Sequence, residues 1–295
     1  MTYPGRVPID VMMPFYGDVA QFRQAVTSVL EQTDGDLRLV VVDDCYPDPE
    51  PREWLASLTD PRVEYLRNET NLGVNGNFRR CVELVEADHF VVMGCDDVML
   101  PDYLGTVRAL ARTHPGASVI APGVQVIDDQ DRVVRPLGDR IKELLTPAAQ
   151  SGRPVVLDGE AMATSLYHGN WTYFPSLLWR TGPVREVGFR PGLEIVLDLA
   201  LLVDLAAAGG ALVHDPAVVF HYRRHEASVS SVQAVDGRRF AEENAFFAAE
   251  ARRCADRGWP RAARAARLHA TSRLNHVQSR VLATVGRLRR TNASA

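Results

Sequence analysis

Residues 37–44 read LRLVVVDD, an apolar run that ends in two aspartates. Two further runs have a similar form: residues 9–16 read IDVMMPFY, and residues 89–97 read HFVVMGCDD. Apolar residues at helical spacing follow each run, so buried strands alternate with helices along this part of the chain. The alternation predicts an α/β fold with a doubly wound, mostly parallel sheet. Because ligands of such sheets bind beyond the carboxyl ends of the strands, we expect both aspartate pairs in one site.

The two pairs, Asp43 with Asp44 and Asp96 with Asp97, place adjacent carboxylates at strand ends. Adjacent like charges destabilise a fold unless a positive group lies near them, and a divalent metal that carries a diphosphate supplies one. The alternative is that these aspartates are solvated turn residues or helix caps. Asp102 is the better cap candidate for the next helix. The sequence therefore favours Asp96 and Asp97 as metal–diphosphate ligands, while Asp43 or Asp44 could accept a hydrogen bond from a base or a ribose.

The composition of the 295 residues is that of a globular protein, with 46% hydrophobic and 24% charged residues. The net charge of −4 gives no indication of nucleic-acid binding. No apolar run approaches the ~18 residues of a membrane-spanning helix, so no transmembrane segment is expected. The four cysteines form no CxxC pair, which fits a reducing cytoplasm better than disulfides or a zinc site. Lys142 is the single lysine, and the scattered arginines indicate a coding bias more than a function.

Two more segments could carry chemistry. Residues 71–73 (Asn-Leu-Gly) form a turn ahead of a helix whose N-terminus could face a nucleotide, although a simple turn is the plainer interpretation. Asp198 lies in the apolar helical run 193–208. Burial there would raise its pKa and make it a usable general base, whereas the alternative is a polar helix face that it shares with Asp204.

Aromatic and basic residues of the second half complete the candidates. Trp171 and Tyr173 could form an apolar platform for an acceptor, although core packing is the commoner role of clustered aromatics. His225 could be a third metal ligand through its neutral imidazole. Arg223 or Arg224 could contact the diphosphate.

These pieces, in this order, resemble the inverting family 2 glycosyltransferases, which have the GT-A fold. The segments that carry the resemblance lie at 13–16, 28–33, 41–44, 71–73, 95–97 with Pro101, and 222–230. The resemblance covers roughly residues 7–232 and implies one GT-A domain at 1–232. Its nucleotide-binding half would be about 1–122 and its acceptor half about 123–232. Residues 233–295 would form a helical extension packed on the core or on a second copy of the chain.

The resemblance implies a role for each matching residue. The residues expected to bind the donor are Pro14, Tyr16, Asp43, Asp44, Asn71, Gly73 and Asp96. Asp96 and Asp97 match the DxD region, and with His225 they would hold a divalent metal, Mn or Mg. Asp198 falls where the catalytic base of the family usually lies.

Some positions depart from the pattern of the family. Gly17 stands where the family often has Asn, and Cys95 interrupts the usual acidic triplet. Leu197 replaces the common Glu before the base, and Phe78 with Arg79 replaces an Arg-Asn pair.

The activity implied is the transfer of a sugar, with inversion, from a nucleoside diphosphate donor of the uridine or thymidine type to a hydroxyl or amine acceptor. Two other functions stay open: nucleotidyl transfer, and noncatalytic binding of a nucleotide sugar. A nucleotidyltransferase would need a glycine-rich basic loop near the N-terminus, and residues 15–18 offer none. The acceptor is not readable from the sequence. A cytoplasmic location and a possible homo-oligomer through the C-terminal helices are expected.

Overall fold

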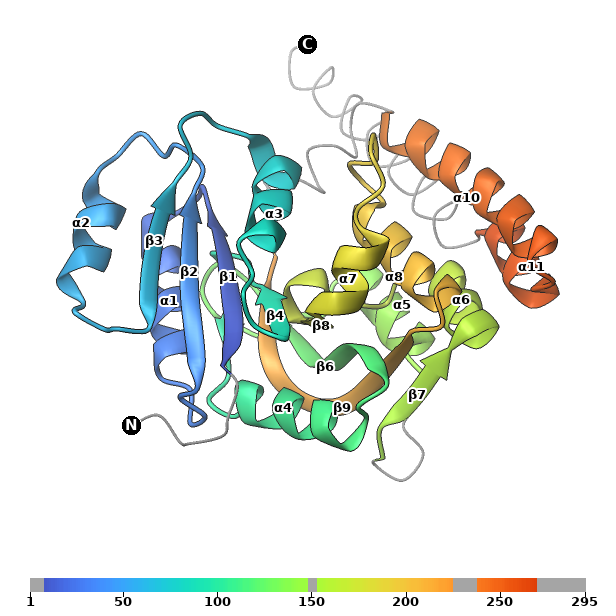
Figure 1. Cartoon of the computed structure of the whole chain (residues 1–295), viewed down its shortest axis with the longest axis horizontal. Coiled ribbons are helices and arrows are strands. Elements are labelled where there is room, and N and C mark those ends of the chain that lie inside the picture. The colour runs from blue at the N-terminus through green and yellow to red at the C-terminus, as the bar shows by residue number, and fades with distance from the viewer. Residues whose placement is uncertain (1–7, 148–152, 225–237, 270–295) are drawn as a thin grey trace, which may run out of the picture.

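The computed structural model describes residues 8–147, 153–224 and 238–269. Nine strands form one sheet in the order β3-β2-β1-β4-β8-β6-β9-β5, and β7 pairs with β9 (Figure 1). The strands are β1 Ile9–Phe15, β2 Leu37–Asp43, β3 Val63–Arg67, β4 His89–Val92, β5 Val98–Met99, β6 Ala117–Ile127, β7 Val155–Asp158, β8 Leu178–Arg180 and β9 Ala211–Arg223. The predicted α/β class is confirmed.

Helices cover both faces of this sheet (Figure 1). They are α1 Val19–Leu30, α2 Glu50–Ser57, α3 Gly73–Glu83, α4 Tyr103–Thr113, α5 Leu137–Leu145, α6 Gly159–His168, η2 Phe174–Ser176, α7 Thr181–Val187, α8 Leu197–Ala207, α10 Arg238–Asp256 and α11 Pro260–Leu268. The sequence also predicts a hairpin of residues 124–127 with 132–134 around residues 128–130. The structure has a single bridge there, between Ile127 and Val133, while residues 124–127 form the end of β6 and pair with β9.

The first half of the sheet is parallel. β1 pairs with β2 from Ile9 opposite Leu37 to Phe15 opposite Asp43, and β1 pairs with β4 on its other side. The carboxyl ends of β1, β2 and β3 point toward the top of Figure 1. This register brings the end of β1 beside the first aspartate pair, as the sequence predicts.

The second half of the sheet is mixed. The short strand β8 lies antiparallel between β4 and β6, while β6 and β9 run parallel. The register of β6 with β9 shifts on both sides of Gly123, where β9 bulges outward. A Cβ atom at Gly123 would lie 2.5 Å from the carbonyl oxygen of Pro216 and 2.7 Å from that of Ala217, so only a glycine lets the bulge approach this closely.

Side chains of the central strands alternate between two apolar cores. Met12 and Val40 belong to the core that α6 and α8 cover, whereas Met13 and Val41 belong to the core under α1 and α4. Successive side chains of a strand point to opposite faces of the sheet. Because helices cover both faces here, the residues that point to either face are apolar.

The helices α10 and α11 pack against the first of these cores, beside α6 (Figure 1). Phe246 and Phe247 are buried there, with the ring of Phe247 against Tyr167. The sequence predicts an apolar stripe on this extension, made of Phe240, Phe246, Phe247, Leu268 and Leu274. Leu268 is 56% exposed, so it is not part of the buried contact. Leu274 lies outside the described residues. A homo-oligomer through these helices stays a prediction.

The division near residue 122 also stays a prediction, and the sheet itself continues through it within β6. No helix of the described residues combines the length and the apolar composition needed to cross a membrane. All four cysteines are free thiols. The cytoplasmic location stays a prediction.

Candidate functional site

The first aspartate pair lies at the carboxyl end of β2, and its charge is compensated within the protein. Asp43 is buried and accepts hydrogen bonds from the Tyr65 hydroxyl, from Tyr46 N at 2.6 Å and from Arg67 Nη1 at 2.9 Å. The Arg67 guanidinium forms an ion pair with this carboxylate. The repulsion that the sequence argument assigned to a metal is relieved here by an arginine.

Asp44 organises the turn at residues 71–73. Its Oδ1 accepts the backbone N–H of Leu72 at 2.8 Å, and its Oδ2 accepts that of Gly73 at 2.9 Å. Asn71 Oδ1 accepts the same Gly73 N–H, and the positive φ of +72° at Gly73 suits a glycine. Asp44 therefore fixes the start of α3 at the edge where β1 and β2 end.

Tyr16 is the accessible aromatic side chain at this edge. It is 56% exposed, and its ring meets that of Tyr46 edge-on at 5.5 Å. The following residue joins the ends of β1 and β4, because a Cβ atom at Gly17 would lie 3.2 Å from Cys95 Sγ. Gly17 and Cys95, two of the departures from the family pattern, are thus neighbours in space. Burial raises the pKa of Cys95 to about 12, so this thiol is neutral.

The second aspartate pair converges on one point. A Cβ atom at Gly94 would lie 2.5 Å from Asp97 Oδ2 and 2.8 Å from Asp96 Oδ1, so both carboxylates face the same space. Asp97 Oδ1 also accepts the backbone N–H of Arg223 at 2.8 Å. Carboxylate oxygens suit hard cations such as Mg²⁺, and two facing carboxylates fit a metal whose other ligands come from a diphosphate.

No group of three His, Cys, Asp or Glu side chains that could hold a metal is found within residues 8–147, 153–224 and 238–269. His225, the predicted third ligand, lies outside these residues. The metal role of Asp96, Asp97 and His225 therefore stays a prediction.

Arg223 has a structural role that the sequence did not indicate. Its guanidinium is buried and donates to the carbonyl oxygens of Asp96 at 2.7 Å and Asp128 at 2.8 Å. It also bonds to Gln24 Oε1 and forms an ion pair with Asp131 at 2.6 Å. These partners occupy the guanidinium, so the expected contact of Arg223 with a diphosphate is not supported.

Arg224 is likewise paired, in its case with Asp139 of α5. Its Nη2 lies 2.7 Å from Asp139 Oδ1, which also accepts the Tyr173 hydroxyl. The ring of Tyr173 lies 5.1 Å from that of Tyr222. Burial raises the pKa of Tyr222 to about 12, and the negative charge of Asp97 adds to the effect. The segment at Tyr173 is therefore linked to the Asp96–Asp97 end of the site.

Asp198 lies in the first turn of α8, which begins at Leu197, whereas the sequence predicts a helix over 193–208 with Asp198 inside it. Its Oδ2 accepts a hydrogen bond from Asn170 Nδ2 at 2.8 Å, and its Oδ1 accepts from Leu199 N at 2.7 Å. Burial raises the pKa of Asp198 above its ordinary value, and the nearby Lys142 charge opposes that rise. A carboxyl group with a raised pKa is suited to taking a proton near neutral pH.

Sequence reasoning missed two neighbours of Asp198. Asn170 is one, and its Oδ1 accepts the Thr172 hydroxyl at 2.7 Å. Lys142 is the other, and its Nζ donates to the Thr172 carbonyl at 2.8 Å. A lone asparagine in a loop gives no pattern to detect. Lys142 stands out in the sequence as the only lysine, and this could have drawn attention to it. From the sequence alone, the scarcity of lysine is attributed to a coding bias.

Asp204 does not share a polar face with Asp198. It pairs with Arg190 through two hydrogen bonds of 2.5 and 2.6 Å, and Arg253 of α10 lies 2.9 Å from the same carboxylate. Arg190 also binds Glu250, whose other oxygen accepts the Tyr167 hydroxyl. Asp204 therefore joins α8 to α10.

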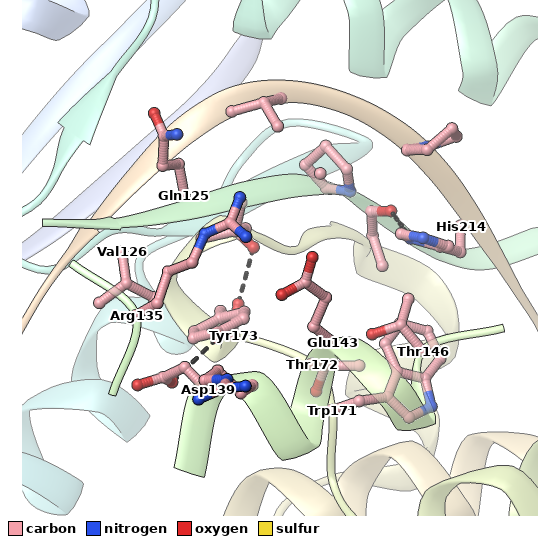
Figure 2. Close-up of a pocket in the computed structure, with 18 of the residues that line it drawn as sticks. Gln125, Val126, Arg135, Asp139, Glu143, Thr146, Trp171, Thr172, Tyr173 and His214 are labelled. Carbon is pink, nitrogen blue, oxygen red and sulfur yellow. Dashed lines mark hydrogen bonds between the residues drawn. The ribbon is translucent and has the colours of Figure 1, made fainter. Parts of the chain in front are cut away.

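A cavity of about 540 Å³ lies between the curved strands β6 and β9 on one side and α5 on the other (Figure 2). Trp171 and Tyr173 line it, and the Glu143 carboxylate points toward its middle. Trp171 is 3% exposed and donates its indole N–H to Ser165, while its ring meets His214 edge-on. Trp171 thus packs in the core and lines the cavity at the same time, whereas Tyr173 is half-buried in the cavity wall. The acceptor role of Trp171 and Tyr173 stays a prediction.

Comparison with known proteins identifies the family. The model of "Glycosyl transferase family 2" matches residues 10–165. The chain is 25% identical over 238 residues to the succinoglycan biosynthesis protein ExoO of Rhizobium meliloti, covering 78% of this chain and 65% of ExoO. It is 32% identical over 249 residues to the uncharacterized protein MT1568 of Mycobacterium tuberculosis, covering 80% of this chain and 73% of MT1568.

Solved structures agree on the fold. The crystal structure of S. aureus TarS 1–349 in complex with UDP-GlcNAc superposes with a TM-score of 0.62 at 14% identity, over 82% of this chain and 66% of that chain. This chain therefore spans about two thirds of the length of ExoO and of that TarS chain. The protein has the GT-A fold, and it is a glycosyltransferase that belongs to glycosyl transferase family 2.

Proposed function

We propose that the enzyme transfers a sugar from a nucleoside diphosphate sugar to a hydroxyl or amine acceptor, with inversion, and that Asp198 is the general base. The observation that carries this proposal is the Asp198 carboxylate in the first turn of α8, hydrogen-bonded to Asn170 and with a raised pKa. A carboxylate of this kind is ionised at neutral pH and can therefore take the proton of the acceptor.

The donor would bind at the carboxyl ends of β1, β2 and β4. The exposed ring of Tyr16 offers a face on which a base can stack, beside Pro14. The residues proposed to surround the nucleotide are Pro14, Tyr16, Asp43, Asp44, Asn71, Gly73 and Asp96. Asp43 and Asp44 would shape this pocket through the backbone groups that they hold. The UDP-GlcNAc in the TarS complex supports a uridine donor, and a thymidine donor is the second candidate.

The reaction would be a single displacement. The acceptor oxygen or nitrogen forms a bond to the anomeric carbon while the bond from that carbon to the diphosphate oxygen breaks. Asp198 takes the acceptor proton, and the diphosphate leaves with the bonding electron pair. Attack on the face opposite the leaving group inverts the anomeric centre. The Asn170 side chain holds the carboxylate in place for this step.

Asp96, Asp97 and His225 would hold a divalent metal, Mn or Mg, which neutralises the charge of the diphosphate. The converging carboxylates at Gly94 support this assignment. The acceptor would approach along Trp171 and Tyr173, which line the cavity beneath β6 (Figure 2). The name of ExoO supports a glycan as acceptor.

The proposal is tested by product analysis. Uridine and thymidine diphosphate sugars are incubated with simple methyl glycosides and Mn²⁺, and products are followed by phosphorus and proton NMR. We expect release of the nucleoside diphosphate and a glycoside of inverted anomeric configuration. Release of a sugar 1-phosphate, with the nucleotidyl group passed to the acceptor, would indicate nucleotidyl transfer. A retained configuration would reject the single displacement, and binding without turnover of any donor would favour a noncatalytic role.

A further inference from the structure

The single lysine of the chain lies next to the segment that holds Asp198. Lys142 projects from α5, and its Nζ donates to the carbonyl oxygen of Thr172 at 2.8 Å. The same ammonium lies 4.2 Å from the centre of the Tyr173 ring, a distance typical of a cation–π contact. Two neighbouring residues therefore hold the ammonium from two sides.

Those contacts lead directly to the base. The hydroxyl of Thr172 donates to Asn170 Oδ1 at 2.7 Å, and Asn170 Nδ2 donates to Asp198 Oδ2 at 2.8 Å. Because the Asn170 amide is bonded through both its oxygen and its nitrogen, its orientation is fixed. The line of contacts from Lys142 through Thr172 and Asn170 ends at the carboxylate.

We propose that Lys142 is a positioning residue for the base: its ammonium holds the segment 170–173, which carries Asn170, the hydrogen-bond donor to Asp198, and it brings a positive charge to this end of the site. The inference rests on the proposed function, in which Asp198 takes the acceptor proton. It extends that function to α5, from which Lys142 would bring a positive charge to the segment that holds the base.

The other titratable groups near Asp198 do not replace this charge. The segment 170–173 contributes only the Tyr173 phenol, whose pKa is raised by burial. The turn before α8 carries Glu194 and is bonded by Glu242 of α10, and both are acidic. Lys142 is the positive charge that opposes the effect of burial on the pKa of Asp198.

An ammonium suits this position better than a guanidinium. It is a compact charge that can donate to one carbonyl while it lies over an aromatic ring. The planar guanidinium is larger and prefers paired acceptors. A chain with one lysine among 33 basic residues uses it at this position.

The first test is the pH dependence of turnover. Without the Lys142 charge, the pKa of Asp198 rises further, so the acidic limb of the kcat profile moves to higher pH. For Lys142→Met we expect a shift of about one pH unit, a roughly tenfold loss of kcat on the acidic limb and recovery at high pH. Lys142→Arg keeps the charge and should return the limb toward wild type. Arg252→Met, which removes an exposed charge from α10, should not move the limb. An unmoved limb in Lys142→Met overturns the inference.

The second test does not need turnover. Reductive methylation with ¹³C-formaldehyde labels the only lysine, and its pKa is read by NMR titration of the folded protein. Since an ionised Asp198 stabilises the ammonium, Asp198→Asn should lower the Lys142 pKa measurably. Equal Lys142 pKa values in the two proteins overturn the inference. If Asp198→Asn lowers the Lys142 pKa but the wild-type protein transfers no sugar, the pairing of Lys142 with Asp198 holds and only the proposed function is wrong.

Discussion

Asn75 of α3 donates a hydrogen bond of 3.0 Å to the carbonyl oxygen of Glu194, across 119 residues of sequence. Asn75 follows the turn that Asp44 fixes, and Glu194 belongs to the turn that leads into α8 and Asp198. The bond therefore joins the side of the site proposed to bind the donor to the side proposed to carry the base. Any change that loosens either turn should affect both.

The turn before α8 is held by the C-terminal helix α10. Glu242 Oε1 accepts three consecutive backbone N–H groups, those of residues 194, 195 and 196, at 3.0, 2.7 and 3.1 Å. Glu242→Ala should lower the free energy of unfolding by roughly 1–3 kcal/mol, because the hydrogen bonds to a charged acceptor are lost. Turnover should also fall, since Asp198 follows this turn.

The measurement is thermal unfolding together with a transfer assay. Glu186→Ala removes an exposed glutamate from α7 and serves as the control. A Glu242→Ala protein with the Tm and turnover of wild type would show that α10 does not support the base.

A second prediction concerns the contact between the ends of β1 and β4. Gly17→Ala places a methyl group 3.2 Å from Cys95 Sγ, which is closer than an ordinary contact. The crowding should cost about 1 kcal/mol of stability and weaken donor binding at the adjacent Tyr16. Cys95→Ala removes the sulfur, so the double variant should recover most of the loss. Calorimetry and thermal unfolding of the four proteins give the coupling energy, and additive effects would refute the contact.

A third prediction concerns the metal. Asp96→Asn should weaken binding of UDP in the presence of Mn²⁺ by tenfold or more, because the neutral amide is a poorer metal ligand. Without metal, the variant and wild type should bind UDP about equally. Asp102→Asn is the control, since this exposed aspartate follows the pair and its carboxylate accepts a hydrogen bond from the Thr33 hydroxyl, away from the carboxylates of the pair. If EDTA leaves the affinity of wild type unchanged, the metal has no part in donor binding.

Sequence alone predicted the parallel half of the fold well, because long apolar strands and helical spacing are local signals. It could not find β8, since Leu178–Arg180 is too short to carry a periodic pattern. It placed Asp198 within a helix over 193–208, and it left open whether Asp198 shares a polar helix face with Asp204. The true partner of Asp204, Arg190, lies in a loop whose contacts only the folded chain reveals.

The two aspartate pairs also show that a sequence pattern locates a residue without revealing its partner. The first pair lies at the end of β2, as the sequence predicts, whereas the second pair lies in the turn between β4, which ends at Val92, and β5. Adjacent carboxylates need a positive neighbour, but the pattern does not say which one. For Asp43 the neighbour is Arg67, from the next strand of the sheet. Partners that pair across the sheet cannot be read from a single sequence.

The last prediction concerns the base itself. Asp198→Asn should lower kcat by roughly 10² or more and leave donor affinity unchanged, because the amide keeps the shape of the side chain and cannot take a proton. Since burial raises the pKa of Asp198, turnover of wild type should fall as pH drops through that raised value, at a higher pH than for an exposed aspartate. Asp198→Asn should lose this acidic limb together with most of its turnover.

Two further variants make this test specific. Asp256→Asn changes an exposed aspartate at the end of α10 and should leave turnover near wild type. Asp204→Asn should act differently, because it weakens the pairing with Arg190 and lowers stability before it affects chemistry. Pre-steady-state rates at a temperature where all proteins are folded separate the two effects. If Asp198→Asn turns over like wild type under those conditions while Asp204→Asn does not, the base must be sought elsewhere on α8.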